Sequence, residues 1–129
     1  MMTFGLAWIA FAVAVAVHVA DEASHDFLSV YNPMARTIRQ KVRLPVPTFS
    51  FSVWLGGLIA GVVLLLLLSP AAFAGSPPLR LVAWPLAILV GIGNALLHFA
   101  GSIRFRRLMP GVHSSPLLLG AAVFLIWSA

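Results

Sequence analysis

The chain has 129 residues, of which 61% are hydrophobic and only 9% are charged. A soluble domain of this size needs a far more polar surface, so water is not the expected solvent. The net charge of +5 does not indicate a nucleic-acid partner, because the basic residues lie in short segments between apolar runs, where they read as topology signals.

Four apolar runs predict an all-α integral membrane protein, a bundle of four transmembrane helices that forms one domain over residues 1–129. A helix that crosses about 30 Å of hydrocarbon uses roughly 20 residues, so the chain holds little else. The spans are expected at about residues 3–24, 48–68, 79–103 and 113–129. The last span has Ser115 and Pro116 as its expected cap and first helical position, and its helix of about 14 residues is short at roughly 21 Å.

Residues 27–47 form a connector that is expected to be partly helical and to lie at the membrane interface. Breaks are expected at Asn32-Pro33 and at Pro45-Val46-Pro47. This connector carries four Lys and Arg residues, the second connector has only Arg80, and the third has three. The bias predicts both termini outside and the first and third connectors in the cytoplasm.

The tryptophans fit the same topology. Trp8, Trp84 and Trp127 are expected in an aromatic belt at the outer interface. Gly57 and Gly61 form a small-xxx-small pair, which with Gly91 indicates close helix packing. Because four helices enclose only a small cavity, a homodimer through the glycine-bearing faces is a candidate arrangement.

The acidic residues give the most informative pattern, because all three lie in one short segment beside two of the four histidines. At about 100° per residue, four of these side chains share one helix face and are expected to converge on one point: His18, Asp21, Glu22 and His25. In the third span Asn94 and His98 lie one turn apart, and His113 begins the last span. Ionisable groups at membrane depth cost several kcal/mol unless they are paired, solvated or bound to metal, so we expect a functional site.

Imidazoles and carboxylates at this spacing are the ligands of helix-borne metal sites. The predicted ligands are His18, Glu22, His25, His98 and His113. Cysteine is absent, so the expected divalent ion is Zn, Fe or Mn. Asp21 and Glu22 are the candidate acid-base residues, and Asn94 would orient a ligand or bind the substrate.

A structural interpretation stands beside each functional one. His25 and Asp26 can be solvated among lipid headgroups, and His113 can be a loop residue. For His18, Glu22 and His98 the alternative is a polar contact between helices. We favour function for these three, because a glutamate and two histidines are a costly way to hold apolar helices together.

The segment His18-Val19-Ala20-Asp21-Glu22 resembles the motif of the HXXEE family of small bacterial integral membrane proteins. The resemblance extends in the same order to Asn94-x-x-x-His98 and to the basic stretch that ends at Pro110-Gly111. One difference is Asp21, where the motif has its first Glu, and its shorter side chain makes it a less secure ligand or proton carrier than Glu22. The resemblance implies a membrane-embedded polar centre with an enzymatic role, in a bacterial plasma membrane, and specifies no reaction.

Three functions are compatible with the sequence. The first is a metal-dependent enzyme that hydrolyses, or adds water to, a lipophilic substrate entering from the cytoplasmic leaflet, with Asp21 as proton carrier. The second is a metal-free acid-base isomerase or cyclase of a hydrophobic substrate, with Trp54 or Phe51 stabilising a cation. The third is a proton or metal-ion carrier, although the outer halves of the spans lack the polar residues that a path would need.

Overall fold

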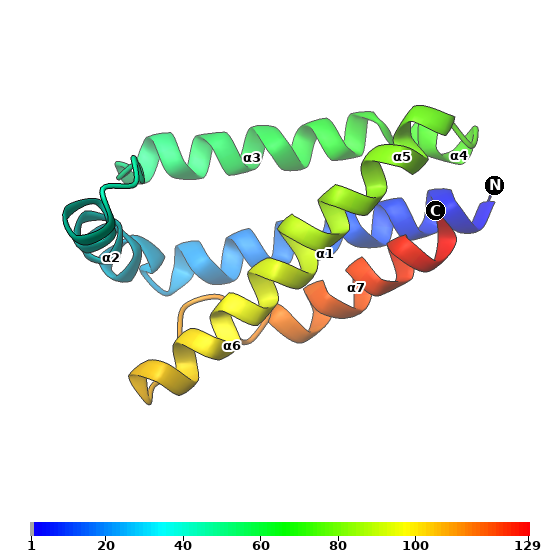
Figure 1. Cartoon of the computed structure of the whole chain (residues 1–129). Coiled ribbons are helices and arrows are strands. Elements are labelled where there is room, and N and C mark those ends of the chain that lie inside the picture. Colours follow the sequence, from blue (N-terminus) through cyan, green and yellow to red (C-terminus); the bar gives the residue numbers. More distant parts are fainter. Residues whose placement is uncertain (1) are drawn as a thin grey trace.

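The computed structural model describes residues 2–129, and this part of the chain contains helices and no strand (Figure 1). The helices are α1 (Met2–Ser24), α2 (Phe27–Val42), α3 (Phe51–Leu67), α4 (Ser69–Phe73), α5 (Pro77–Leu86), the π-helix η1 (Ala87–Gly93), α6 (Asn94–Phe105) and α7 (Ser115–Ser128). The segments α5, η1 and α6 follow one another without a break and form one long helix. The all-α prediction is therefore confirmed for the described residues.

Three helical segments are long and apolar enough to cross a membrane: Met2–Ser24, Phe51–Phe73 and Pro77–Phe105. The fourth expected span, α7, is apolar but has only 14 residues. The apolar runs thus become helices at about the predicted positions, whereas the crossing of a membrane by all four stays a prediction.

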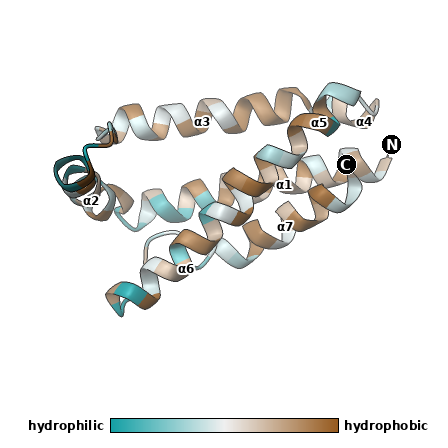
Figure 2. Ribbon diagram, in the orientation of Figure 1, coloured by the Kyte–Doolittle hydropathy of each residue, from teal (hydrophilic) through white to brown (hydrophobic). Residues whose placement is uncertain are grey.

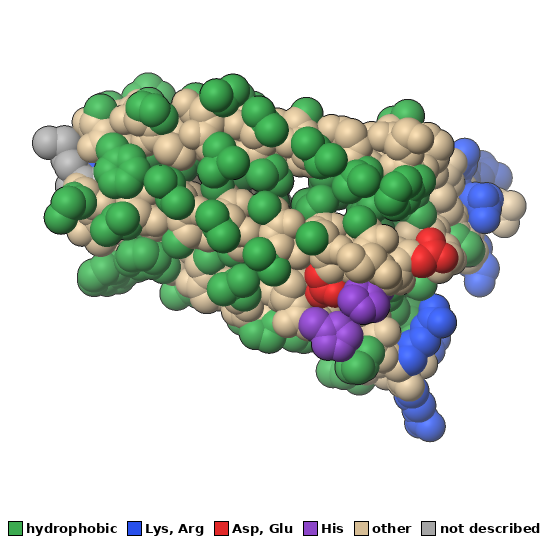
Figure 3. Space-filling model, turned by 180° about the vertical axis from the view of Figure 1, so that it is seen from behind, with side chains coloured by type: hydrophobic (Ala, Val, Ile, Leu, Met, Phe, Trp, Pro, Cys, Tyr) green, Lys and Arg blue, Asp and Glu red, His purple; other side chains and the backbone are tan. Residues whose placement is uncertain are grey.

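The basic side chains are distributed unequally between the two ends of the molecule. Both chain termini lie at one end, next to α4, and most Lys and Arg side chains gather at the other end, where α2 and the last turn of α6 lie (Figures 1 and 3). Arg80 lies at the terminal end, where its guanidinium donates to the carbonyls of Ser128 and Ala129 at 3.1 and 2.9 Å. This segregation agrees with the predicted topology, and the orientation in a membrane remains a prediction.

Small residues line the contacts between the helices. Helix α1 packs against α3, α4 and α7, and α7 also packs against η1 and α6. A Cβ on Gly91 would clash with Ala122, so only glycine permits this crossing of η1 and α7. The surface, in contrast, carries large apolar side chains such as Leu67, Leu89 and Ile103 (Figures 2 and 3). A close helix crossing at small residues, with large apolar side chains on the surface, is typical of helix bundles packed in lipid.

Helix α2 continues through Pro33, so the break predicted at Asn32-Pro33 is wrong. Pro33 removes one helical hydrogen bond, but the Asn32 side chain fastens the helix to the segment that follows it. Its Nδ2 donates to the Phe49 carbonyl at 2.9 Å, and its Oδ1 accepts from the Phe49 N–H at 3.0 Å. Tyr31 adds a hydrogen bond to the Pro47 carbonyl at 3.0 Å, so residues 43–50 return along α2 in a non-helical conformation.

Trp8 is not part of an outer aromatic belt, contrary to the prediction. Its side chain is buried between helices, and its Nε1 donates to the Leu65 carbonyl of α3 at 2.8 Å. An indole N–H buried among apolar residues needs such a partner. Gly57 and Gly61 pack against nothing within the chain, since a Cβ on either would meet no atom within 4 Å. Their role in close packing is thus limited to contacts outside this chain, and the homodimer stays a prediction.

Candidate metal centre

Three buried polar side chains meet between α1 and α6. His18 and Glu22 lie one turn apart on α1, and His98 reaches them from α6. The Glu22 Oε1 lies 2.9 Å from His98 Nε2 and 3.5 Å from His18 Nε2. The two imidazole rings meet edge to face, with centroids 4.8 Å apart. All three residues are at most 5% exposed, so the group is shielded from solvent. We call it the inner cluster.

The turn before α7 closes the inner cluster from one side. Gly111 in this turn has φ +89°, a left-handed conformation that L side chains rarely adopt. A Cβ there would lie 2.7 Å from His98 Cε1 and 3.0 Å from Glu22 Cγ. The backbone therefore approaches the cluster as closely as it does only because residue 111 is a glycine.

Ser114 links the inner cluster to Asp21. Its backbone N–H and its hydroxyl both donate to Asp21 Oδ2, at 2.9 and 2.7 Å. The same hydroxyl oxygen lies 2.8 Å from His18 Nδ1. A hydroxyl has one hydrogen, and the carboxylate takes it, so the Ser114 oxygen accepts the hydrogen on His18 Nδ1. This fixes His18 in the tautomer whose Nε2 carries a lone pair.

His18 Nε2 is the atom that the protein leaves unsatisfied. It is buried and has no hydrogen-bond partner among the described residues. Buried polar atoms are normally paired, and an exception calls for an explanation such as a missing ion. The lone pair on Nε2 is the form of imidazole that binds a metal, and a hydrogen bond on the other ring nitrogen is the usual support of such a ligand.

The inner cluster fits a divalent metal ion. Its three ligand atoms, one from each side chain, lie within 4.8 Å of one another. Two histidines and one carboxylate form a common set for catalytic zinc and for non-haem iron, with a position left open for water or substrate. Bonds of about 2.1 Å in a tetrahedron place ligand atoms roughly 3.4 Å apart, close to the spacing seen here.

Asp21, His25 and His113 form a separate outer cluster, so the expected convergence of His18, Asp21, Glu22 and His25 on one point is wrong. Asp21 Oδ1 lies 2.9 Å from His25 Nδ1 and 3.9 Å from His113 Nδ1. Both imidazoles are more than half exposed. The pairs 18/22 and 21/25 are offset by three residues, about 60° around the helix, and Ser114 lies between them. Asp26 belongs to neither cluster and is exposed at the start of α2.

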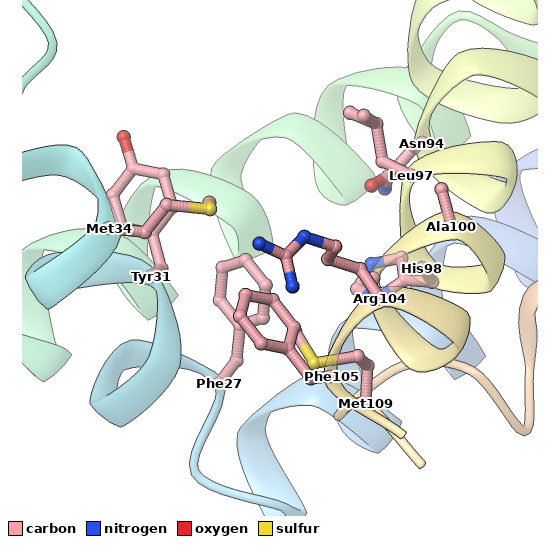
Figure 4. Close-up of a pocket in the computed structure, with 11 residues that line it drawn as sticks. Phe27, Tyr31, Met34, Asn94, Leu97, His98, Ala100, Arg104, Phe105 and Met109 are labelled. Carbon is pink, nitrogen blue, oxygen red and sulfur yellow. The ribbon is translucent and has the colours of Figure 1, made fainter. Parts of the chain in front are cut away.

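A cavity of about 490 Å³ adjoins the inner cluster between α2 and α6 (Figure 4). His98 belongs to both the cluster and the cavity wall. Asn94 also lines the cavity, one turn from His98, and its side chain makes no hydrogen bond within residues 2–129. This favours substrate binding over orientation of a ligand as the role of Asn94.

An aromatic ring that the sequence did not single out lies beside the cluster. Phe27 lines the cavity, and its ring centroid is 5.8 Å from that of His98. Trp54 stacks on the other side of Phe27 at 5.7 Å, and Phe51 packs on Trp54 at 6.0 Å. Neither of these two predicted cation stabilisers lines the cavity in the described structure.

Sequence reasoning also missed Ser114. The run Ser114-Ser115-Pro116 indicates a helix start, but the expected cap, Ser115, lies inside α7, where its hydroxyl donates to the Gly111 carbonyl at 2.8 Å. Ser114 is the N-cap residue, and its side chain makes no cap hydrogen bond because it is engaged with Asp21 and His18. No local pattern distinguishes this use of a serine from ordinary capping.

Over residues 8–126 the sequence matches the family described as "Protein of unknown function with HXXEE motif". The chain belongs to the HXXEE family. The motif is represented by His18, Asp21 and Glu22, so this HXXEE protein places two motif residues in the inner cluster and one in the outer cluster. No curated protein and no solved structure matches the chain.

Replacing Ser114 by alanine is expected to lower the metal affinity of the inner cluster by about 10- to 100-fold, the usual effect of losing a partner that orients a ligand. His18 Nδ1 would lose its acceptor, so the ring could take either tautomer. Metal affinity is measured by competition with a chromophoric chelator, and the tautomer by nitrogen NMR of labelled histidine in metal-free protein. Ser115→Ala is the matched control, because its hydroxyl donates to the Gly111 carbonyl and to neither Asp21 nor His18. An unchanged affinity and tautomer in Ser114→Ala would contradict the assigned role.

Proposed function

We propose that this HXXEE protein is a membrane-embedded metalloenzyme that hydrolyses, or adds water to, a lipophilic substrate bound between α2 and α6 at the cytoplasmic leaflet. One observation carries the proposal: His98 belongs both to the inner cluster and to the wall of the cavity. A substrate in the cavity would therefore lie next to an ion held by His18, Glu22 and His98. The apolar lining favours a lipophilic molecule.

In the proposed reaction the inner cluster, Glu22 and Asn94 have different roles. A zinc, iron or manganese ion bound by the inner cluster would supply an activated water at its open position. The Glu22 carboxylate has a second oxygen that can accept the proton from this water. In hydrolysis the water oxygen bonds to the electrophilic carbon, the bond to the leaving group breaks, and the proton passes from Glu22 to that group. Asn94 would donate a hydrogen bond to a substrate oxygen.

Asp21 has a different role in this proposal from the proton carrier expected from the sequence. It is not among the residues that line the cavity, and its carboxylate is occupied by Ser114 and His25. Its contribution is to orient Ser114 and, through the hydroxyl, His18.

A metal-free isomerase or cyclase is the second candidate, because Phe27 presents a ring to the cavity and has Trp54 stacked behind it. Such a ring can stabilise a cation in the substrate. The carrier function has less support, since the buried core from the cluster to the terminal end is apolar and includes Phe4, Trp8 and Phe11. Within this core of the described residues, an ion would meet no polar side chain on a path from the cluster to the terminal end.

The test is elemental analysis of untagged protein purified in detergent without chelator. We expect one zinc, iron or manganese ion per chain and hydrolysis of a long-chain nitrophenyl ester that stops on chelation and returns when the metal is added. A folded, metal-free protein that still turns over the ester would overturn the metal-dependent mechanism. Isomerisation of a hydrophobic alkene without metal would favour the second candidate.

A further inference from the structure

We infer that the cavity between α2 and α6 binds a single-chain amphiphile, with its anionic headgroup at Arg104 and its hydrocarbon chain along α6 past His98. This names the substrate class of the proposed function and rests on that function for the reaction only. Binding itself requires the cavity and Arg104 and does not require a metal.

The cavity has the shape of a groove along one face of α6. Seven of its lining residues come from α6, and all of them except Ala100 recur at the spacing of one helix face: Asn94, Leu97, His98, Gly101, Arg104 and Phe105. From residue 94 to residue 104 the helix rises about 15 Å. The opposite wall is formed by Phe27, Tyr31 and Met34, which lie on one face of α2. A volume of about 490 Å³ in this elongated form suits one chain better than two.

Arg104 supplies the only cationic side chain of the cavity wall. In Figure 4 its guanidinium extends across the space between the α2 residues and α6. Within the described part of the chain it has no ion pair, because every salt bridge there joins a histidine to Asp21 or Glu22. A guanidinium that no protein anion neutralises, at the mouth of an apolar groove, is suited to a carboxylate or phosphate of a ligand.

The apolar lining decides against a free anion as the ligand. Apart from its few polar residues the groove is walled by apolar side chains such as Leu97, Phe105 and Met109, which gain nothing from inorganic phosphate. The headgroup would lie at the end of the molecule where the Lys and Arg residues gather, and the chain would point toward the middle (Figure 3). His98 lies about 9 Å along α6 from Arg104, so the reacting group belongs to the body of the amphiphile and not to its headgroup.

The test is the binding of radiolabelled oleate and of lysophosphatidylglycerol to the full chain in a neutral detergent, with monooleoylglycerol as the uncharged comparison. We expect either anionic amphiphile to bind at least about tenfold more tightly than the uncharged one, since it gains a charge-assisted contact. Preference for oleate assigns a carboxylate headgroup, and preference for the lysophospholipid assigns a phosphate. Equal binding of the uncharged amphiphile, or of inorganic phosphate alone, would overturn the inference.

Two variants locate the binding. Arg104→Gln should remove the preference for the anionic amphiphile. Arg106→Gln should keep it, because Arg106 follows the end of α6 and does not line the cavity. Ala100→Trp should block the groove and weaken the binding of all three amphiphiles. The measurements are repeated with Glu22→Gln, which lacks the carboxylate ligand. A wild-type chain that binds amphiphile but no metal would uphold this inference and count against the proposed function, whereas a wild-type chain that binds metal but no amphiphile would do the reverse.

Discussion

A chain with both His18→Ala and His98→Ala is expected to lose its bound metal, whereas a chain with His25→Ala and His113→Ala keeps it. The first pair supplies two of the three ligand atoms of the inner cluster. Loss of a group that only hydrogen-bonds to a metal ligand weakens metal binding by roughly 10- to 100-fold. Loss of two ligands should therefore weaken it by more than roughly 100-fold. Metal content is measured by elemental analysis after dialysis against metal-buffered detergent solution.

The two double variants are matched because each removes two imidazoles that contact a carboxylate on α1. They differ in burial: His18 and His98 are buried, while His25 and His113 are more than half exposed. Equal loss of metal from both variants would mean that ligands from both clusters hold the ion. Retention of metal in the first variant and loss in the second would contradict the proposed centre.

The first variant leaves Glu22 buried without a partner, and it can therefore fail to fold. Glu22→Gln avoids this problem, since the amide fills the same space without a charge and its Oε1 still accepts from His98. It should fold, as judged by gel filtration and thermal unfolding in detergent, and bind metal weakly. A folded Glu22→Gln protein with wild-type metal affinity would show that the glutamate is no ligand.

The helices could be predicted from the sequence because apolar runs in a membrane have one solution for their backbone hydrogen bonds. The starts and ends of α1 and of Pro77–Phe105 follow directly from where those runs begin and end. The prediction of a helix break at Asn32-Pro33 was wrong because it considered local residues alone. A partner seventeen positions away, Phe49, satisfies the Asn32 side chain, and no local rule contains that contact.

Three of the five predicted ligands lie together in the inner cluster, but the division into two clusters could not be predicted from the sequence. His18 and Glu22 share a helix face by spacing, and His98 was assigned to the same depth, so the inner cluster could be assembled from the sequence. Its separation from the outer cluster depends on where the turn at 111–114 enters between the helices. That turn is positioned by Ser114 and Asp21 across 93 positions of the chain. Periodicity along one helix carries no information about such an insertion.

Gly111→Ala is expected to destabilise the protein and to disturb the inner cluster. A left-handed φ costs a non-glycine residue about 1–3 kcal/mol, and forcing an extra methyl into a packed site costs typically another 1–3 kcal/mol. The methyl carbon would lie 2.7 Å from His98 Cε1, so the imidazole or the turn must shift. We expect the free energy of unfolding to fall by roughly 2–6 kcal/mol, measured by denaturation in detergent, and the metal affinity to fall with it.

Substitutions at two other glycines serve as controls that separate an effect on stability from an effect on metal affinity. Gly75 also has a positive φ, +75°, but lies before α5 at the terminal end, so Gly75→Ala should lower stability and leave metal affinity unchanged. A Cβ on Gly120 in α7 would meet nothing within 4 Å, so Gly120→Ala should raise stability slightly through helix propensity. If Gly111→Ala lowered stability without changing metal affinity, the close approach of the turn would serve packing alone. Only the joint loss ties this glycine to the cluster, because the clash falls on two residues that are proposed to hold the ion.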